Sequence, residues 1–349
     1  MKNGNGRRRI GLMTGGGDAP GLNGIIEATV RSLAAAPVDI IGICDGFDGV
    51  YERRTVTLDS ESVLNAHMNA GTILGSSNKS STRGREEEFL KAFAELKLDG
   101  LIAAGGDGTF EGLGRVIRGL KLIGVPKTID NDLQGTDVTF GFDTACAVVA
   151  DAVDALRATA DAHKRVFVVE AMGRTTGWIA LGGGLASYAD VILVPERPIS
   201  RTALKAYLLE LQKKKRRGAM IVVGEGAHFE GESAKVAFRV EGSHQAERLG
   251  GISLEIARWI EKEIGWESRN VILGHLQRSR HPTTTDRFMT AAMGVEVARM
   301  VTENDWGKAV VLRGGLITRA PLADLMKPPR HVDADHRWVQ VAKSMGIFI

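Results

Sequence analysis

The stretch from Pro126 to Asp132 contains a cation, a hydroxyl and two acids within seven residues. Phosphoryl transfer uses such groups: a base for the attacking hydroxyl, and cations that face the charge developing on the transferred group. In that chemistry Asp130 is the candidate base and Lys127 would face the phosphoryl group, while Asp132 would hold metal-bound water or orient Asp130. The alternative is a capped turn, because Asp and Asn also favour turns and helix N-termini.

Two apolar runs must position the acidic residues. Residues 120–125 are predicted to form a buried parallel strand, so the polar stretch follows its carboxyl end, where open α/β sheets bind ligands. Residues 101–104 form a second such strand before Gly105-Gly106-Asp107-Gly108-Thr109. Asp107 can reach a magnesium-bound water there, and the adjacent glycines leave room for a polyphosphate.

Strand and helix patterns alternate along the 349 residues, which are enough for two domains of about 100–200 residues each. This alternation predicts the α/β class with mostly parallel sheets. We place a domain boundary near the start of a long helix at 142–162. The other expected strands are 10–14, 38–43, 165–171, 191–194, 219–223, 270–273 and 309–313. The other expected helices are 22–33, 85–97, 111–120, one ending near 186, 201–215, 253–264, 286–301 and 336–344.

A glycine-rich turn, Gly15 to Gly21, follows the first strand and opens a helix. It either presents backbone N–H groups to an anion or is simply a tight turn. Neither GxGxxG nor GxxxxGK[ST] fits it, so neither a dinucleotide fingerprint nor a Walker A loop is present. Two later loops leave similar alternatives. In the first, Tyr51 either lies against an adenine or packs within the protein. The second, which ends in Asn78 and Lys79, either holds phosphate or is a flexible surface loop.

Basic residues occur at predicted strand ends in the second half of the chain. They are Arg165, Arg174, Arg269, His275 and Arg278. Each alone would be read as a surface residue, but together they suggest a receptor for a phosphorylated small molecule, because guanidinium groups pair bidentately with phosphate. Glu225 would then accept hydrogen bonds from substrate hydroxyls.

The composition, with 44% hydrophobic and 25% charged residues, is typical of a globular protein. A net charge of +3 is close to balance, so it argues against nucleic-acid binding driven by the overall charge of the protein. The basic run 213–217 is interpreted as a solvated helix end. No apolar segment is long enough for a membrane span or a signal core, so a cytoplasmic location is expected. Cys44 and Cys146 lack the spacing of a zinc site.

Six motifs in order, GGGDAPG, GGDGT, PKTIDND, MGR, GEG and LGHLQR, resemble the 6-phosphofructokinase family between Gly15 and Arg278. The resemblance implies two Rossmann-like three-layer α/β/α domains with the active site in the cleft between them. Residues 1–142 and roughly 277–327 would bind the phosphoryl donor, and 143–276 with roughly 328–349 would bind fructose 6-phosphate. It also implies Mg²⁺ and a homotetramer or homodimer in which a neighbouring subunit completes the sugar-phosphate site.

The resemblance assigns roles by position. Asp130 would be the general base for the sugar 1-hydroxyl, supported by Thr128 and Asp132. Arg174 and Lys127 would face the transferred phosphoryl group. The sugar would contact Met172, Gly173, Glu225 and Arg278. Its 6-phosphate would contact Arg165, Arg269 and His275, with Arg165 and Arg269 reaching across from the next subunit. The donor would contact Gly16, Tyr51, Asn78, Lys79, Asp107, Gly108 and Thr109, with Asp107 serving the metal.

Two positions bear on the donor. Diphosphate-using members of the family have an acid where this chain has Gly108, and that acid would repel the α-phosphate of a nucleotide. Lys127 is compatible with either donor, so ATP is favoured and diphosphate is the alternative. The chain departs from the family at Asn78, where an arginine is usual, at 279–282, and at Glu27, which replaces an effector-binding arginine and would repel an anion.

Three other functions remain to be weighed. A related substrate such as sedoheptulose 7-phosphate is possible, because the arginines recognise the phosphate more than the carbon chain. A catalytically silent subunit is disfavoured by the presence of Asp107, Asp130 and Arg174 together. A nicotinamide oxidoreductase is disfavoured by the missing GxGxxG fingerprint.

Overall fold

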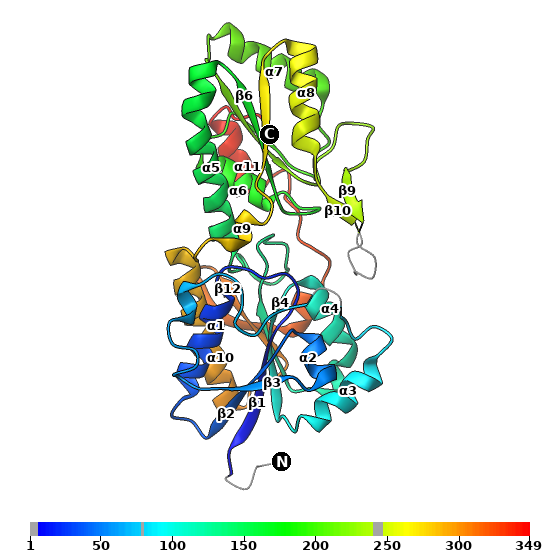
Figure 1. The fold of residues 1–349 in the computed structure, drawn as a ribbon, viewed down its shortest axis with the longest axis vertical. Helices are drawn as coiled ribbons and strands as arrows, with labels where there is room; N and C mark the ends of the chain where they lie inside the picture. Colours follow the sequence, from blue (N-terminus) through cyan, green and yellow to red (C-terminus); the bar gives the residue numbers. More distant parts are fainter. Residues whose placement is uncertain (1–5, 78–79, 240–246) are drawn as a thin grey trace. The chain divides into compact units, whose positions relative to one another are not determined.

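The structure is a computed structural model that describes residues 6–77, 80–239 and 247–349. The chain divides into two compact units (Figure 1). Unit 1 contains Met1–Ile129, Leu133–Asp143 and Arg278–Pro329, and unit 2 contains Asp130–Asp132, Thr144–Gln277 and Arg330–Ile349. Asn78 and Lys79, two of the predicted donor contacts, lie outside the described residues.

The described part of unit 1 is built on a seven-stranded sheet with the order β13-β12-β5-β4-β1-β2-β3. The inner strands pair in parallel, and the two edge strands, β3 and β13, are antiparallel to their neighbours. The strands are β1 (Arg8–Thr14), β2 (Val38–Ile43), β3 (Thr55–Leu58), β4 (Gly100–Gly105), β5 (Leu122–Pro126), β12 (Lys308–Arg313) and β13 (Leu316–Pro321).

Helices cover both faces of this sheet (Figure 1). One face packs against α1 (Leu22–Leu33) and α10 (Thr284–Glu303), and the other against α2 (Phe47–Glu52), α3 (Glu86–Glu95) and α4 (Asp107–Val116). Short 3₁₀ turns occur at Ala66–Met68, Ile117–Gly119 and Leu322–Met326. The inner strands are apolar on both sides, as a parallel sheet buried by two helix layers requires.

The described part of unit 2 has a four-stranded parallel sheet with the order β11-β6-β8-β7. Its strands are β6 (Val166–Ala171), β7 (Val191–Leu193), β8 (Ala219–Gly224) and β11 (Ser268–Ile272). Its helices are α5 (Phe142–His163), α6 (Trp178–Ala186), α7 (Arg201–Lys213), α8 (Ile252–Ile264), α9 (Leu276–Ser279, partly in unit 1) and α11 (Arg337–Ser344). A separate hairpin pairs β9 (Val236–Arg239) with β10 (Glu247–Leu249).

Both units therefore confirm the predicted α/β class with mostly parallel sheets. The helix predicted from about 111 to 120 is present with shifted bounds: α4 begins at Asp107 and ends at Val116, and the 3₁₀ turn Ile117–Gly119 follows it. The earlier start is favoured by Asp107, because an acid in the first turn stabilises a helix by opposing its dipole. The segment after β2 was expected to be a loop and forms α2 instead. Within the described residues, no helix is both long and apolar enough to cross a membrane.

Candidate active site

The polar stretch that follows β5 is divided between the two units. Lys127 and Thr128 belong to unit 1, whereas Asp130, Asn131 and Asp132 group with unit 2. All five residues are buried, with exposed fractions of 8% or less. Asn131 has a φ of 53°, in the left-handed region that Asn tolerates better than most residues. The backbone of the stretch is therefore tightly specified rather than that of a solvated turn.

In unit 1, two cations converge on the glycine-rich turn after β1. The Lys127 ammonium donates a hydrogen bond to the carbonyl of Gly17. The Arg278 guanidinium donates to the carbonyl of Asp18 at 2.6 Å. A Cβ on Gly17 would lie 3.0 Å from Nη1 of Arg278, so glycine permits this close approach. The turn thus carries positive charge from two side chains, which suits a phosphate-bearing ligand.

The first turn of α4 supplies the acid of this region. Asp107 is half-buried at the start of the helix, and a Cβ on Gly108 would meet nothing within 4 Å. Thr109 is 3% exposed and packs against two glycines. A Cβ on Gly15 would lie 2.6 Å from its hydroxyl oxygen, and a Cβ on Gly105 would lie 2.4 Å from its Cβ. The space around Gly108 is therefore open to a side chain.

Tyr51 packs in the core of unit 1, the second of its two predicted alternatives. Its ring is 7% exposed, and its hydroxyl donates to the carbonyl of Ser81 at 2.9 Å. The guanidinium of Arg85 lies 3.7 Å from the ring centroid, and Phe89 contacts the ring edge. The guanidinium of Arg85 therefore covers one face of the Tyr51 ring. Gly16 remains on the half-buried glycine-rich turn.

In unit 2, the loops after β6 and β8 meet at the carboxyl edge of the sheet. The two strands are in register, with Ala171 opposite Gly224, so the following residues are adjacent. The N–H of Arg174 donates to Oε1 of Glu225 at 2.9 Å. A Cβ on Gly226 would lie 2.0 Å from the carbonyl oxygen of Arg174, so this close approach requires glycine. The edge holds Arg174 in a left-handed conformation with φ at 55°.

The 130–132 segment lies at this same edge. The Thr176 hydroxyl donates to the carbonyl of Asp130 at 3.5 Å. Burial, together with the negative charges of Asp130 and Glu170, raises the pKa of Glu225 to about 7, although hydrogen bonds from the backbone of Arg174 and Gly173 act in the opposite direction. Unit 2 thus brings together the candidate base, a half-buried arginine and a carboxyl group that holds its proton near neutral pH.

The raised pKa of Glu225 predicts a pH-dependent stability. Between pH 4.5 and about 7 the unfolded chain ionises Glu225 while the folded chain keeps it protonated, so the stability that this group confers is lost as pH rises. The shift corresponds to at most about 3 kcal/mol. We expect Glu225→Gln to flatten the fall in unfolding free energy between pH 5 and 8 in urea titrations. The exposed Glu230→Gln is the control, and parallel profiles for all three proteins would contradict the assignment.

The basic residues predicted to form one receptor lie at two opposite edges of the unit 2 sheet. His275 follows β11 at the carboxyl edge, whereas Arg165 precedes β6 and Arg269 is the second residue of β11. Glu267 pairs with Arg165 at 2.8 Å and with Arg269 at 2.5 Å. Within one chain Arg165 and Arg269 therefore lie apart from His275, because parallel strands in register separate their amino and carboxyl ends by the length of the strand.

Glu170 is a buried acid at this edge that the sequence analysis missed. It lies in β6 and accepts hydrogen bonds from the N–H of Gly251 at 2.9 Å and from the N–H and hydroxyl of Ser253 at 2.9 and 2.7 Å. Its carboxylate thus satisfies the free N–H groups at the start of α8. An acid inside an otherwise apolar strand was the available signal, since a buried charge must be paired.

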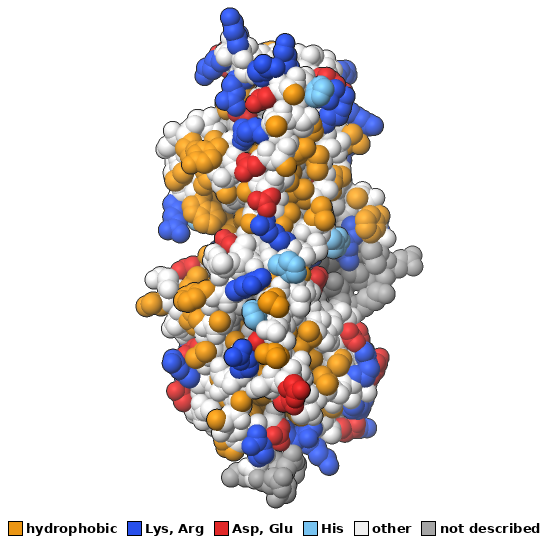
Figure 2. Space-filling view, turned by 60° about the vertical axis from the view of Figure 1, so that its left-hand side comes forward, with side chains coloured by type: hydrophobic (Ala, Val, Ile, Leu, Met, Phe, Trp, Pro, Cys, Tyr) orange, Lys and Arg blue, Asp and Glu red, His pale blue; other side chains and the backbone are white. Residues whose placement is uncertain are grey.

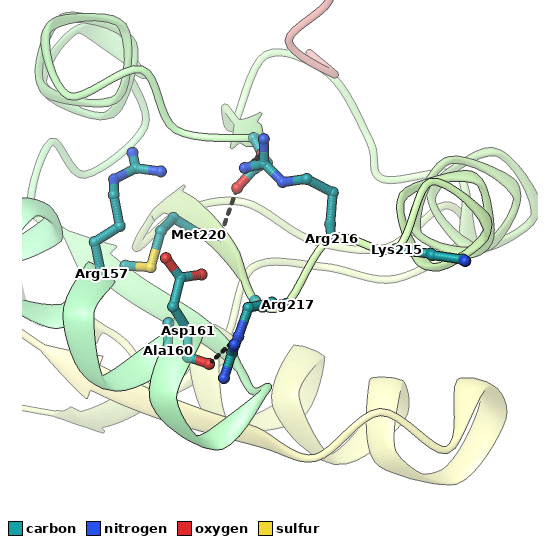
Figure 3. Close-up of a pocket in the computed structure, with 9 residues that line it drawn as sticks. Arg157, Ala160, Asp161, Lys215, Arg216, Arg217 and Met220 are labelled. Atoms are coloured by element: carbon teal, nitrogen blue, oxygen red, sulfur yellow. Dashed lines mark hydrogen bonds and ion pairs between the residues drawn. The ribbon is translucent and has the colours of Figure 1, made fainter.

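A basic cavity of about 400 Å³ lies at the amino edge of the unit 2 sheet (Figure 3). Arg216 pairs with Asp190 at 2.8 Å, Arg157 donates to the carbonyl of Ser187 at 2.6 Å, and Arg217 to that of Asp161 at 3.0 Å. The exposed run 213–217 begins at the last residue of α7, so it is a helix end, as expected. Figure 2 shows Lys and Arg side chains gathered at the upper edge of its view. The cavity lies at the opposite edge from Glu225, outside the candidate active site.

Glu27, which was expected to repel an anionic effector, forms side-chain contacts with other residues of unit 1. It is 3% exposed and contacts Nδ1 of His67 at 2.6 Å and Arg31 at 3.0 Å. Burial alone would raise its pKa, but the hydrogen bonds from His67 and Arg31 lower it overall. The carboxylate therefore stays ionised where the resemblance places an arginine.

Parallel α/β sheets, cations on a glycine-rich turn, and an acid beside Arg174 are together the features of a phosphotransferase. The sequence pattern of the family described as Phosphofructokinase matches residues 9–301. An ATP-dependent 6-phosphofructokinase of Chloroflexus aurantiacus is 41% identical, over 98% of this chain and 97% of the relative. A pyrophosphate--fructose 6-phosphate 1-phosphotransferase of Amycolatopsis methanolica is 40% identical, over 94% of this chain and 98% of the relative.

A solved phosphofructokinase of Saccharomyces cerevisiae superposes with a TM-score of 0.78 and 27% identity, over 92% of this chain. The match covers 45% of the yeast chain, so this chain spans less than half of that protein. These comparisons confirm the resemblance found in the sequence motifs. The chain belongs to the phosphofructokinase family.

Proposed function

We propose that this protein is an ATP-dependent 6-phosphofructokinase. It transfers the γ-phosphoryl group of ATP to the 1-hydroxyl of fructose 6-phosphate and releases fructose 1,6-bisphosphate and ADP. The observation that carries the proposal is the convergence of Asp130, Arg174 and Glu225 at one edge of the unit 2 sheet. The relatives named ATP-dependent 6-phosphofructokinase support it, as does the open space at Gly108.

In the proposed mechanism Asp130 accepts the proton of the 1-hydroxyl as its oxygen attacks the γ-phosphorus and the bond to ADP breaks. Thr128 and Asp132 support Asp130, while Arg174 and Lys127 face the charge on the transferred group. The Glu225 carboxyl, with its raised pKa, can donate as well as accept a hydrogen bond with a sugar hydroxyl near neutral pH. Met172 and Gly173, beside it on the β6 loop, and Arg278 complete the proposed sugar contacts.

Mg²⁺ is part of this proposal, with Asp107 as the residue that serves it. Among the described residues no cluster of three or more His, Cys, Asp or Glu could hold a metal by itself. One carboxylate at the N-terminus of α4 nevertheless fits this ion, because Mg²⁺ is commonly held by one or two carboxylates together with substrate phosphates. When bound, it would neutralise charge on the donor phosphates.

We further propose that two subunits share each 6-phosphate site, in a homodimer or homotetramer. The position of Arg165 and Arg269 at the amino edge, away from His275, supports this arrangement, because within one chain they do not join the other sugar-binding residues. A cytoplasmic location is also part of the proposal, since both substrates are intracellular metabolites.

Product analysis tests the substrate and the position of transfer. Fructose 6-phosphate and Mg·ATP are expected to give fructose 1,6-bisphosphate, identified by phosphorus NMR, with one ADP per product. Sedoheptulose 7-phosphate, given at the same concentration, is the comparison. A higher kcat/KM with the seven-carbon sugar would replace fructose 6-phosphate as the substrate, and phosphorylation at another hydroxyl would contradict the proposed mechanism.

The donor preference predicts the effect of Gly108→Asp. The added carboxylate has space in the fold, yet it would repel the α-phosphate of ATP, so kcat/KM for ATP should fall at least about 10-fold. Gly108→Asn, of the same shape without the charge, is the matched control and should keep most of the activity. Equal losses in both variants would show that the side chain's bulk, rather than its charge, decides the outcome.

Diphosphate is the second candidate donor. Lys127 adds positive charge at the glycine-rich turn, and the Amycolatopsis methanolica relative is named for pyrophosphate. A diphosphate enzyme would work reversibly with inorganic phosphate, which distinguishes it from the ATP-dependent reaction.

A further inference from the structure

The carbonyl groups of the 130–132 segment are all hydrogen-bonded within unit 2. The hydroxyl of Thr176 donates to Asp130 at 3.5 Å. Both remaining carbonyls accept from one residue, Arg330: its guanidinium Nη2 donates to Asn131 at 2.9 Å, and its backbone N–H donates to Asp132 at 2.6 Å. Arg330 follows the segment by almost two hundred residues and is the first residue of the C-terminal part of unit 2.

Arg330 is itself fixed by a tryptophan. The indole N–H of Trp178 donates to the carbonyl of Arg330 at 2.8 Å, and the guanidinium carbon lies 4.8 Å from the centroid of the same ring. His336 and Trp338 pack edge-on against Trp178, with ring centroids 4.8 and 6.4 Å away. Since both the main chain and the side chain of Arg330 are held, the two hydrogen bonds to the segment have little freedom to shift.

The neighbouring residues of the C-terminal part are held in the same way. Oε1 of Glu196 accepts from the N–H of Val332 at 2.8 Å and from the N–H of Gly177 at 3.0 Å. The carboxylate thereby ties the chain after Arg330 to the start of α6, the helix that carries Trp178. The link from the C-terminal part to the 130–132 segment therefore rests on a rigid frame.

These contacts matter because the segment departs from regular backbone. Asn131 has a φ of 53° and is 1% exposed, so truncating the Arg330 side chain would remove a hydrogen bond from a carbonyl that lies away from solvent. A rotation at Asn131 would turn the side chain of Asp130, which precedes it. A displacement of about 1 Å in a catalytic group can cost about 100-fold in rate.

We propose that Arg330 is a positioning residue that fixes the catalytic conformation of the 130–132 segment. It acts through the carbonyls of Asn131 and Asp132, to which it donates hydrogen bonds. The inference rests on the proposed function of Asp130 as the base. Through Arg330, the C-terminal part of the chain would take part in catalysis, although it lies far in sequence from the motifs around Asp130.

The test compares Arg330→Met with Arg197→Met. Arg197 also donates from its guanidinium to a carbonyl of the C-terminal part, that of Ala334 at 3.2 Å, but does not contact the 130–132 segment. Arg330→Met should lower kcat about 100-fold, with KM values for fructose 6-phosphate and ATP within about 2-fold of the wild type. Arg197→Met should keep kcat. Guanidinium ion should restore part of the kcat of Arg330→Ala, which a general loss of stability would not permit.

A second readout does not depend on activity. Hydrogen exchange at residues 131–133 should accelerate in Arg330→Met and stay unchanged in Arg197→Met. Unchanged exchange together with wild-type kcat in Arg330→Met would overturn the positioning role. So would a loss of kcat that only parallels a lower unfolding temperature and is not rescued by guanidinium. A third outcome separates the two proposals. If the wild-type protein had no phosphofructokinase activity but Arg330→Met still accelerated the exchange, the proposed function would be refuted, whereas the contact that positions the segment would be established.

Discussion

Replacing Asp130 by Asn is expected to lower kcat by about 100- to 10,000-fold, the usual contribution of a positioned general base. The carboxamide matches the carboxylate in shape but cannot accept the proton of the 1-hydroxyl. Folding and the binding of fructose 6-phosphate should be preserved, because the segment is held through its backbone carbonyls rather than through this side chain alone. Stopped-assay turnover and isothermal titration with the sugar phosphate measure the two effects separately.

Asp161→Asn is the matched control for this variant. Asp161 is an exposed acid beside the basic cavity, at the opposite edge of the unit 2 sheet, so the same change of charge should leave kcat near that of the wild type. Near-normal turnover in Asp130→Asn would remove Asp130 from the role of base, and Asp132 would become the next candidate.

Arg174→Ala is expected to lower kcat about 1,000-fold or more, as the loss of an arginine that stabilises a transferring phosphoryl group does. Arg174→Lys keeps the charge but loses the planar, bidentate geometry, so it should recover only part of the rate. The measurement is kcat at saturating substrates, with KM values determined in parallel.

Arg53→Ala controls for the backbone conformation in this experiment. Arg53 has a φ of 56°, against 55° for Arg174, and its side chain pairs with Glu95 on the surface of unit 1. Any cost of placing alanine in the left-handed region is therefore common to both variants. If Arg53→Ala lost as much activity as Arg174→Ala, the effect would come from the backbone and not from the guanidinium.

Strands and most helices could be predicted from the sequence because their residues form uninterrupted apolar runs or amphipathic repeats. The predicted strand at 38–43 and helix at 22–33 match the structure, and the long helix predicted at 142–162 ends at His163. The edge strands β3 and β13 and the exposed hairpin β9–β10 were not predicted, because short or solvent-facing strands lack such a run.

Candidate site residues could be proposed from the sequence where short motifs contain the chemistry, as at Asp107 and Asp130. The geometry of the site could not be predicted, because the relevant contacts join residues far apart in the chain. The basic residues at strand ends illustrate the limit: the sequence placed Arg165 at the start of one strand and His275 after another, but it did not show that these two strands, β6 and β11, are neighbours in parallel register. The contact of Arg330 with Asn131 spans 199 positions, and no local pattern indicates it.

The central claim, an ATP-dependent phosphofructokinase, is tested most directly by initial rates with fructose 6-phosphate and Mg²⁺, giving ATP and diphosphate separately to the same preparation. We predict turnover with ATP and little or none with diphosphate, because Gly108 leaves space for the nucleotide. Activity with diphosphate alone would contradict the account and would mean that Lys127 and its surroundings decide the donor.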